Sequence, residues 1–284
     1  MVEQRKFSIS RIIAYMLLTI FILLISGELS GFLIEHGLPK PLGQLLSGLM
    51  FTISALIIVK YIHSKNPSIL REIKLVGYSN KRDLIIALIL PFLITLAAFG
   101  IVIGTGMISN FRISTDIHIW SMFLFNCIFA ILYEAFPEEV LIRGLILNEL
   151  RKKFNFMESL FIQPLLFSII GGVAHIVTNL IHMGGPEIFS VIEHMIQFYL
   201  FGFVIQLYRE FSGSLFANML FHLVCLETTR FIFVSSELSI IKFDEIAFGF
   251  TSLVGLFFGL YLGSAIILSF LLWLRKRNYE KSNK

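Results

Sequence analysis

The stretch that decides the fold is IHIWSMFLFNCIFAILYEAFPEEVLIR, residues 117–143. It begins as an apolar run of the length that a helix needs to cross a bilayer, about 20 residues, and it closes with Glu138, Glu139 and Arg143. Because ionisable side chains are costly inside a membrane, three of them together in one spanning segment indicate a functional site.

The composition of the whole chain is that of a membrane protein. Of its 284 residues, 56% are hydrophobic and 15% are charged, and the mean hydropathy of +0.84 reflects an apolar content above that of soluble domains. The apolar runs predict an all-α, polytopic transmembrane helix bundle of about eight spans, forming a single domain over residues 1–284. The predicted spans are residues 12–34, 43–62, 83–107, 117–137, 159–180, 188–208, 213–234 and 246–274.

The basic residues predict how the spans are oriented. They gather before the first span, in the second, fourth and sixth connections, and after the last span, namely Arg5, Lys6, Arg11, Lys60 to Arg82, Arg151, Lys152, Lys153, Arg209, Arg275, Lys276 and Arg277. By the positive-inside rule both termini are cytoplasmic, which agrees with an even number of spans. We therefore expect a multi-pass protein of the plasma membrane, with the paired carboxylates near the cytoplasmic end of the fourth span.

The net charge of +4 does not indicate a nucleic-acid partner. The cations lie in connections beside the membrane, where they set the topology and meet anionic lipid, so membrane lipids are expected partners. The longest of these connections, residues 64–82, has apolar residues at helical spacing, which predicts a helix lying in the cytoplasmic interface. These residues are Ile69, Leu70, Ile73 and Val76. A solvated linker is the alternative for this segment.

The charged end of the fourth span suggests a division of roles between its two carboxylates. Residues four apart share a helix face, so Glu139 and Arg143 can form an ion pair. Glu138 is turned by about 100° from Glu139 and stays available to take a proton, with Glu134 on its own face one turn earlier. A structural salt bridge at a helix end is the alternative when this segment is taken alone.

Two histidines in later spans favour a catalytic role. His175 lies late in the fifth predicted span and His222 lies midway along the seventh. One carboxylate and two imidazoles can activate water and stabilise the oxyanion that forms when water attacks an amide. Zinc is an alternative, because Glu138, His175 and His222 are suitable ligand types, but the sequence contains no H-E-x-x-H motif.

Two motifs resemble those of the CAAX prenyl protease type 2 and bacteriocin-processing (Abi) family of intramembrane proteases. Residues 137–144, PEEVLIRG, look like the E-E-x-x-x-R-G motif of that family, and the stretch from Phe201 to His222 is similar to the approach to its last histidine motif. The resemblance covers roughly residues 130–230, within a protease-like core of about residues 117–234. It implies an intramembrane endopeptidase that acts on peptide or membrane-protein substrates.

The resemblance also implies a role for each residue of the site. Glu138 would be the general base on water, assisted by His175, and His222 would help to bind the oxyanion. Glu139 and Arg143 would be supporting residues. The family is usually described as glutamate-dependent, so the resemblance implies no cofactor and no obligatory metal ion.

The sequence departs from the family pattern at two positions. Gly171 stands where the second motif, F-x-x-x-H, has phenylalanine, and Leu226 stands where the third, H-x-x-x-N, has asparagine. Leucine cannot donate a hydrogen bond to an oxyanion, and the loss of one such donor typically costs on the order of 10²–10³ in rate. The second departure therefore bears on turnover more than on the fold.

Asn179 and Asn218 each lie four residues from one of the two histidines, on the same helix face. Their amides can replace the lost donor, or they can form hydrogen bonds between helices. Leu226 also favours a different function, that of a catalytically degenerate relative serving as an immunity, regulatory or scaffold protein. A transporter is the third alternative, because buried carboxylates and histidines also form proton relays. Nothing in the sequence specifies the oligomeric state.

Overall fold

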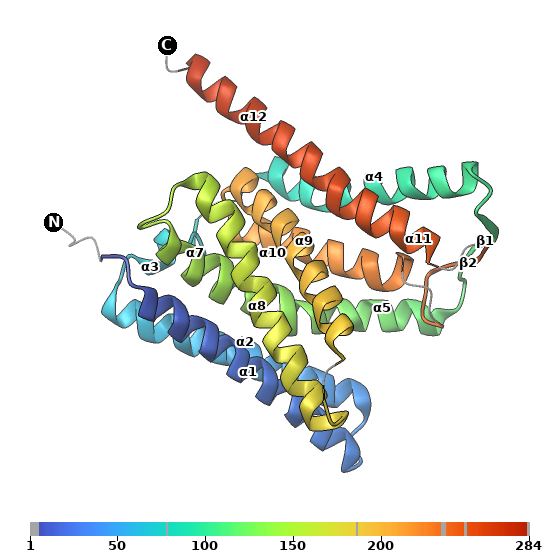
Figure 1. Cartoon of the computed structure of the whole chain (residues 1–284), viewed down its shortest axis with the longest axis horizontal. Coiled ribbons are helices and arrows are strands. Elements are labelled where there is room, and N and C mark those ends of the chain that lie inside the picture. Colours follow the sequence, from blue (N-terminus) through green and yellow to red (C-terminus); the bar gives the residue numbers. More distant parts are fainter. Residues whose placement is uncertain (1–5, 78, 186, 234–236, 247–248, 283–284) are drawn as a thin grey trace.

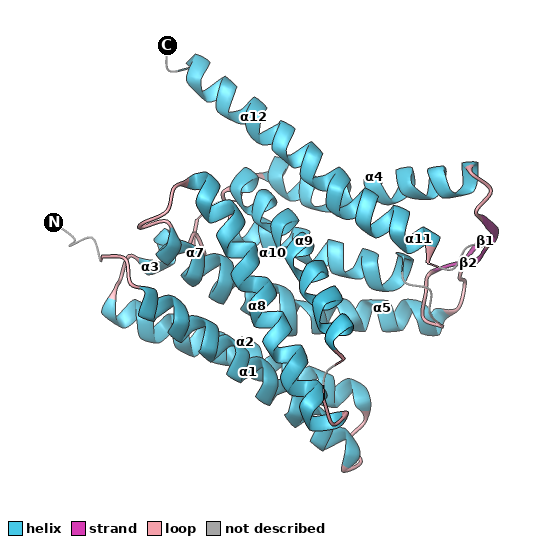
Figure 2. Ribbon diagram, viewed as in Figure 1, coloured by secondary structure: helices cyan, strands magenta, loops and turns pink. Residues whose placement is uncertain are grey.

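The computed structural model describes residues 6–77, 79–185, 187–233, 237–246 and 249–282, and it is a bundle of long helices (Figure 1). Helix makes up most of the described chain (Figure 2). Eight of the described helices are long and apolar enough to cross a membrane, which confirms the predicted class. They are Ile9–Glu35 (α1), Lys40–Lys65 (α2), Lys81–Gly104 (α4), Ile117–Leu150, Phe156–His182 (α8), Ile188–Ser212 (α9), Leu215–Phe233 and Phe250–Arg277.

Three of these spans combine α-helical and π-helical segments. The fourth consists of α5 (Ile117–Ala130), the π-helix η1 (Ile131–Ala135), α6 (Phe136–Glu138), the π-helix η2 (Glu139–Ile146) and α7 (Leu147–Leu150). The seventh consists of α10 (Leu215–Thr228) and the π-helix η3 (Thr229–Phe233), and the eighth of α11 (Phe250–Ser252), the π-helix η4 (Leu253–Gly263) and α12 (Ser264–Ser282). Such π-helical turns are rare in general and are frequent at functional sites.

The fourth span is longer than the sequence predicted. Ending it at residue 137, with Glu138 and Glu139 at the helix end, is wrong, because the helix continues to Leu150 and is 34 residues long. The physical reason is that the apolar residues after the carboxylates pack into the core and so keep the chain helical. These residues are Val140, Leu141, Ile142, Leu145 and Ile146, none of them more than 2% exposed. The two carboxylates therefore lie inside a packed helix.

The apolar core has two large clusters. The first joins α1, α2, η2 and α8 and includes Phe51 and Phe167. The second joins α4, α9, α10 and α12 and includes Tyr208 and Phe221. Phe201 of α9 packs against both clusters, so the region around its ring lies between two well-packed parts of the bundle.

Helices α8 and α9 approach closely because α8 has two adjacent glycines at their contact. A side chain at Gly171 would collide with the ring of Phe198, and a Cβ atom at Gly172 would lie 2.6 Å from Cγ of Met195. The phenylalanine that the family motif has at position 171 would therefore not fit here. Its space is filled from α9 by Phe198.

A small antiparallel sheet was not predicted from the sequence. Strand β1 (Ile108–Ile113) pairs with β2 (Ile241–Glu245), with Ile108 opposite Glu245 and Ile113 opposite Ile241. The pair joins the third and seventh connections at the end of the bundle away from both termini (Figure 1). Strands this short, far apart in the sequence, have no local pattern that separates them from loops.

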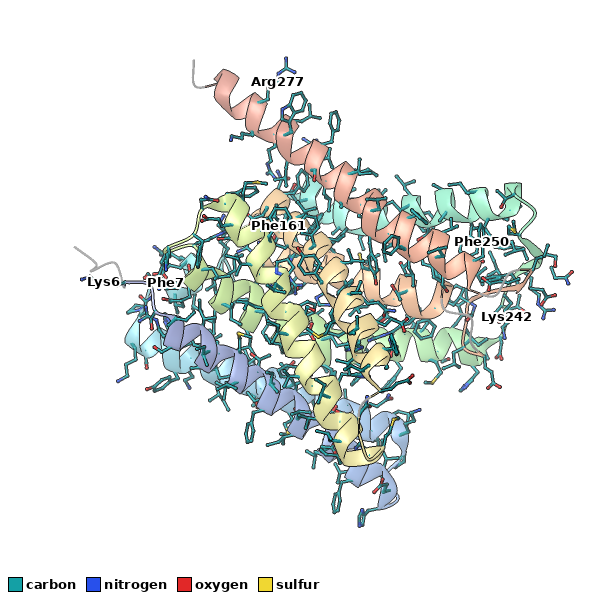
Figure 3. All side chains as sticks on the ribbon, viewed as in Figure 1. Lys6, Phe7, Phe161, Lys242, Phe250 and Arg277 are labelled. Carbon is teal, nitrogen blue, oxygen red and sulfur yellow. The ribbon has the colours of Figure 1, made fainter. Side chains whose placement is uncertain are left out.

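The N-terminal segment and the even-numbered connections gather at the other end of the bundle. Lys6 and Phe7 lie on one side of the molecule and Lys242 lies on the opposite side (Figure 3). The guanidinium of Arg11 is 2.7 Å from the Glu149 carboxylate, and that of Arg275 is 3.5 Å from the Asp83 carboxylate. The arrangement is that of alternating spans, and its orientation in the membrane stays a prediction. Arg5 lies outside the described residues.

The connection at residues 64–82 is less helical than expected. It contains one helix of four residues, Ile69–Glu72 (α3). Ile69 and Ile73 are buried in the first core cluster, whereas Val76 is exposed. Part of the predicted apolar stripe thus packs against the protein itself.

Candidate active site

Glu139 is the centre of a buried polar network. Its Oε1 atom lies 2.7 Å from Nη1 of Arg143, which donates to it, and 2.9 Å from Nδ1 of His222. Its Oε2 atom accepts a hydrogen bond from the amide of Asn218. All four residues are at most 1% exposed. Glu139 is thus paired with a cation and held by two further polar groups, the arrangement that a buried carboxylate requires.

Glu138 has a different environment, although it is the adjacent residue. Its side chain is 12% exposed, and Nε2 of His222 lies 3.9 Å from its Oε2 atom. This distance is too long for a direct hydrogen bond. A water molecule in contact with both atoms can bridge polar groups at such a separation. The two nitrogens of the same imidazole therefore face the two adjacent glutamates.

The surrounding helices hold these side chains in place. The guanidinium of Arg143 lies over the ring of Phe167 on α8, 4.6 Å from the ring centroid, and a cation in this position is attracted to the ring. Gly202 of α9 leaves room for that ring, because a Cβ atom there would be 2.7 Å from it. The ring of Phe201 packs edge-on against His222, with 5.0 Å between centroids.

His175 belongs to a second polar group. Its Nε2 atom lies 3.1 Å from the amide nitrogen of Asn179 and 3.2 Å from the hydroxyl of Ser190, and its ring stacks on His194 at 4.4 Å. Within the described ranges, no hydrogen bond or ion pair joins His175 or Asn179 to Glu138 or His222. The structure thus brings Glu138, Glu139, Arg143, Asn218 and His222 together and has His175 and Asn179 in a separate group.

Two ionisable side chains of the seventh span, Arg230 and Glu227, were missed by the sequence analysis as members of the polar groups inside the bundle. Arg230 of η3 donates two hydrogen bonds to the Glu134 carboxylate, at 2.6 and 2.7 Å. Glu227 of α10 accepts a hydrogen bond from Asn126 at 2.8 Å. The sequence did contain a signal for them: both are ionisable residues inside a predicted span, and such residues indicate function.

The site offers few side-chain atoms that could act as ligands of a metal ion. Across the part of the chain that the structure describes, no group of three His, Cys, Asp or Glu side chains lies close enough to hold one. Glu138 and His222 supply two ligands of suitable type. A zinc ion bound between them would need further ligands from outside this group.

A comparison with known protein families gives a match for the central part of the chain. Residues 116–226 match the model of a protein family described as type II CAAX prenyl endopeptidase Rce1-like. No curated protein and no solved structure matches the chain. The match includes both motifs and confirms the resemblance inferred from them: this central segment is similar to the CAAX-type family of intramembrane proteases. The first three spans and the last lie outside the matched segment.

Proposed function

We propose that the protein is an intramembrane endopeptidase in which Glu138 activates a water molecule for attack on a peptide bond. The observation that carries the proposal is the contrast between the two glutamates. Glu139 is fully engaged by Arg143, Asn218 and His222, whereas Glu138 keeps a partly exposed carboxylate beside an imidazole nitrogen. Peptides and membrane proteins are the proposed substrates.

The chemistry follows from the neighbours of each atom. With Nδ1 protonated toward Glu139, Nε2 of His222 points to the water beside Glu138. Glu138 takes a proton as the water oxygen bonds to the carbonyl carbon, and it returns that proton to the amine as the carbon–nitrogen bond breaks. His222 carries a proton on both ring nitrogens throughout this reaction, with its charge balanced by Glu139, so Nδ1 donates to Glu139 and Nε2 donates to the oxyanion. The role of His175 in this reaction rests on the family motif alone.

The experiment compares cell membranes that contain the wild-type chain with membranes that contain Glu138→Gln, and new peptide ends are identified by mass spectrometry. We expect Glu138→Gln to abolish them, because an amide cannot take up the proton, while the protein still folds. The matched control is Glu193→Gln, an exposed residue of α9 whose contact is a hydrogen bond from Gln197 at 3.2 Å. New ends formed by Glu138→Gln at the wild-type rate would contradict this mechanism.

The alternative is a degenerate relative that acts as an immunity, regulatory or scaffold protein. It is favoured by Leu226 and by the contacts of His175, which lead away from Glu138. In that case wild-type membranes contain no new peptide ends, and Glu138→Gln complements a deletion phenotype as well as the wild type does.

A further inference from the structure

A buried arginine outside the candidate active site forms no ion pair with any described carboxylate. Arg209, near the end of α9, is 2% exposed. Its Nη2 atom donates to the carbonyl oxygen of Ile73 at 3.1 Å, and its Nε atom has no hydrogen-bond partner. Within the described chain, no carboxylate lies within ion-pair distance of its guanidinium. Because a buried charge without a counter-ion is costly, this position is suited to an anion that the chain itself does not supply.

Three further cations lie around Arg209. Arg209 contacts the backbone of Ile73, next to Lys74, while Arg151 and Arg275 contact Glu210 and Phe211, the two residues that follow Arg209. The charges of the three arginines add to burial in lowering the pKa of Lys74 below its ordinary value. We call Lys74, Arg151, Arg209 and Arg275 the Arg209 cluster.

The nearby carboxylates do not neutralise the Arg209 cluster. Glu210 forms an ion pair with Arg151 and also accepts a hydrogen bond from Gln206 at 2.6 Å. Asp83 lies 3.5 Å from Arg275. Glu210 and Asp83 thus each already face an arginine other than Arg209. Glu139, whose charge also acts on Arg209, is paired with Arg143.

Hydrogen-bond donors from the start of α10 border the same cluster. The carbonyl oxygen of Lys74 accepts from the backbone nitrogen of Leu215 at 3.3 Å, which places Lys74 beside the first turn of this helix. The hydroxyls of Ser79 and Ser214 lie 2.6 Å apart at that turn. The N-terminal end of a 14-residue helix adds a partial positive charge. Cations, hydroxyls and a helix N-terminus together match the chemistry of a phosphate group.

We propose that the Arg209 cluster binds a phosphate group, and that an anionic phospholipid headgroup supplies it. The cluster lies where α9 ends and α4 and α10 begin, so it stands at the level of the headgroups if these helices span the bilayer. Basic pockets between helices at this level are suited to anionic headgroups. The proposal does not depend on peptide hydrolysis, so its test and the test with Glu138→Gln can fail separately.

The binding experiment uses the full chain in phosphatidylcholine nanodiscs with increasing fractions of phosphatidylglycerol. Bound lipid is counted by native mass spectrometry. We expect Lys74→Gln/Arg151→Gln to weaken phosphatidylglycerol binding by at least about fivefold for each charge removed. The control is Arg112→Gln/Lys242→Gln, an arginine and a lysine that face each other across β1 and β2 at the opposite end of the bundle. Equal losses in both double variants would mean unspecific attraction and would overturn the proposal.

A second measurement separates binding from folding. In pure phosphatidylcholine, Lys74→Gln should leave the Tm unchanged or raise it, because one repelling charge is removed. With phosphatidylglycerol present, the same variant should have a lower Tm than the wild type, which gains stability from the bound lipid. A Tm lowered equally in both lipids would mean a role in folding alone and would refute the site.

A third measurement distinguishes the source of the phosphate. Inorganic phosphate is added to the wild-type chain in phosphatidylcholine nanodiscs, and the Tm is recorded. We expect a much smaller rise than phosphatidylglycerol produces, because a lipid also contributes its acyl chains. An equal rise would keep the phosphate site and exclude the lipid as its source.

Discussion

At the scale of single residues, two adjacent glutamates have opposite surroundings. Neighbouring positions on a helix are turned by about 100°, so Glu139 points into the network of Arg143, Asn218 and His222 while Glu138 does not. The imidazole of His222 lies between them, with one nitrogen toward each carboxylate. The difference in side-chain direction thus separates a carboxylate with three polar partners from one that is partly exposed beside an imidazole nitrogen.

The ion pair between Arg143 and Glu139 gives a prediction on stability. Arg143→Met should lower the free energy of unfolding by about 3–5 kcal/mol, because it leaves the Glu139 charge buried without its cation. Unfolding in detergent micelles, followed by circular dichroism, measures the loss. The double variant Arg143→Met/Glu139→Gln removes the lone charge and should recover most of it. If the double variant is as unstable as the single one, charge burial is not the cause.

Leu226 gives a prediction on turnover. It is partly buried on α10, one turn after His222, so in the proposed mechanism Leu226→Asn adds a hydrogen-bond donor on the helix face of His222. We expect the rate of product formation in reconstituted vesicles to rise on the order of 10²-fold. Leu226→Ala is the control, because it makes the same space without a donor. A similar rise in the rate with both variants would mean that the smaller side chain, and not the added amide, causes the increase.

At the scale of elements, the contact between α8 and α9 sets the geometry around the site. Gly171 of α8 and Gly202 of α9 let the rings of Phe198 and Phe167 fill the space between the helices. Phe167 in turn carries the guanidinium of Arg143 on its face. The packing of one helix pair therefore positions the cation that holds Glu139.

The close approach of α8 and α9 leads to a prediction on stability: a methyl group added at a glycine of this contact should destabilise the protein. Gly171→Ala and Gly172→Ala should each lower the free energy of unfolding by about 1–3 kcal/mol, since the added atom overlaps Phe198 or Met195. Gly100→Ala in α4 is the matched control, because a Cβ atom there meets nothing within 4 Å, and it should be neutral or stabilise by about 0.5–1 kcal/mol. Thermal unfolding in one detergent compares all three, and equal effects would contradict the packing account.

At the scale of the whole molecule, the bundle has two unlike ends. One has the described N-terminal segment, α3, the fourth connection and the Arg209 cluster; the other has the two-stranded sheet (Figure 1). Basic residues are concentrated at the first end, which the positive-inside rule assigns to the cytoplasm.

The orientation can be measured with single cysteines. In a chain whose Cys127 and Cys225 are replaced by serine, Lys6→Cys should react with a membrane-impermeant thiol reagent only in inside-out vesicles. Lys242→Cys at the opposite end (Figure 3) should react only in right-side-out vesicles. Reaction of both from one side would rule out the predicted topology.

The sequence by itself determined the number and approximate position of the eight spans, and it indicated the pairing of Glu139 with Arg143. These features are local. The length of an apolar run is set by the thickness of the bilayer, and residues four apart on one helix face are neighbours whatever surrounds them. The same local view ended the fourth span too early, because continued burial in the core was needed to extend it.

Only the tertiary structure decided which polar residues meet across helices. His222 reaches Glu139 over 83 positions of sequence, and Arg230 reaches Glu134 over 96, while His175 meets His194 instead of Glu138. That Arg209 forms no ion pair with a described carboxylate is equally invisible in the sequence. These contacts depend on how each helix is rotated about its axis, and a shift of one residue turns a side chain by about 100°. Packing of the two core clusters sets that rotation, and no single span contains the information.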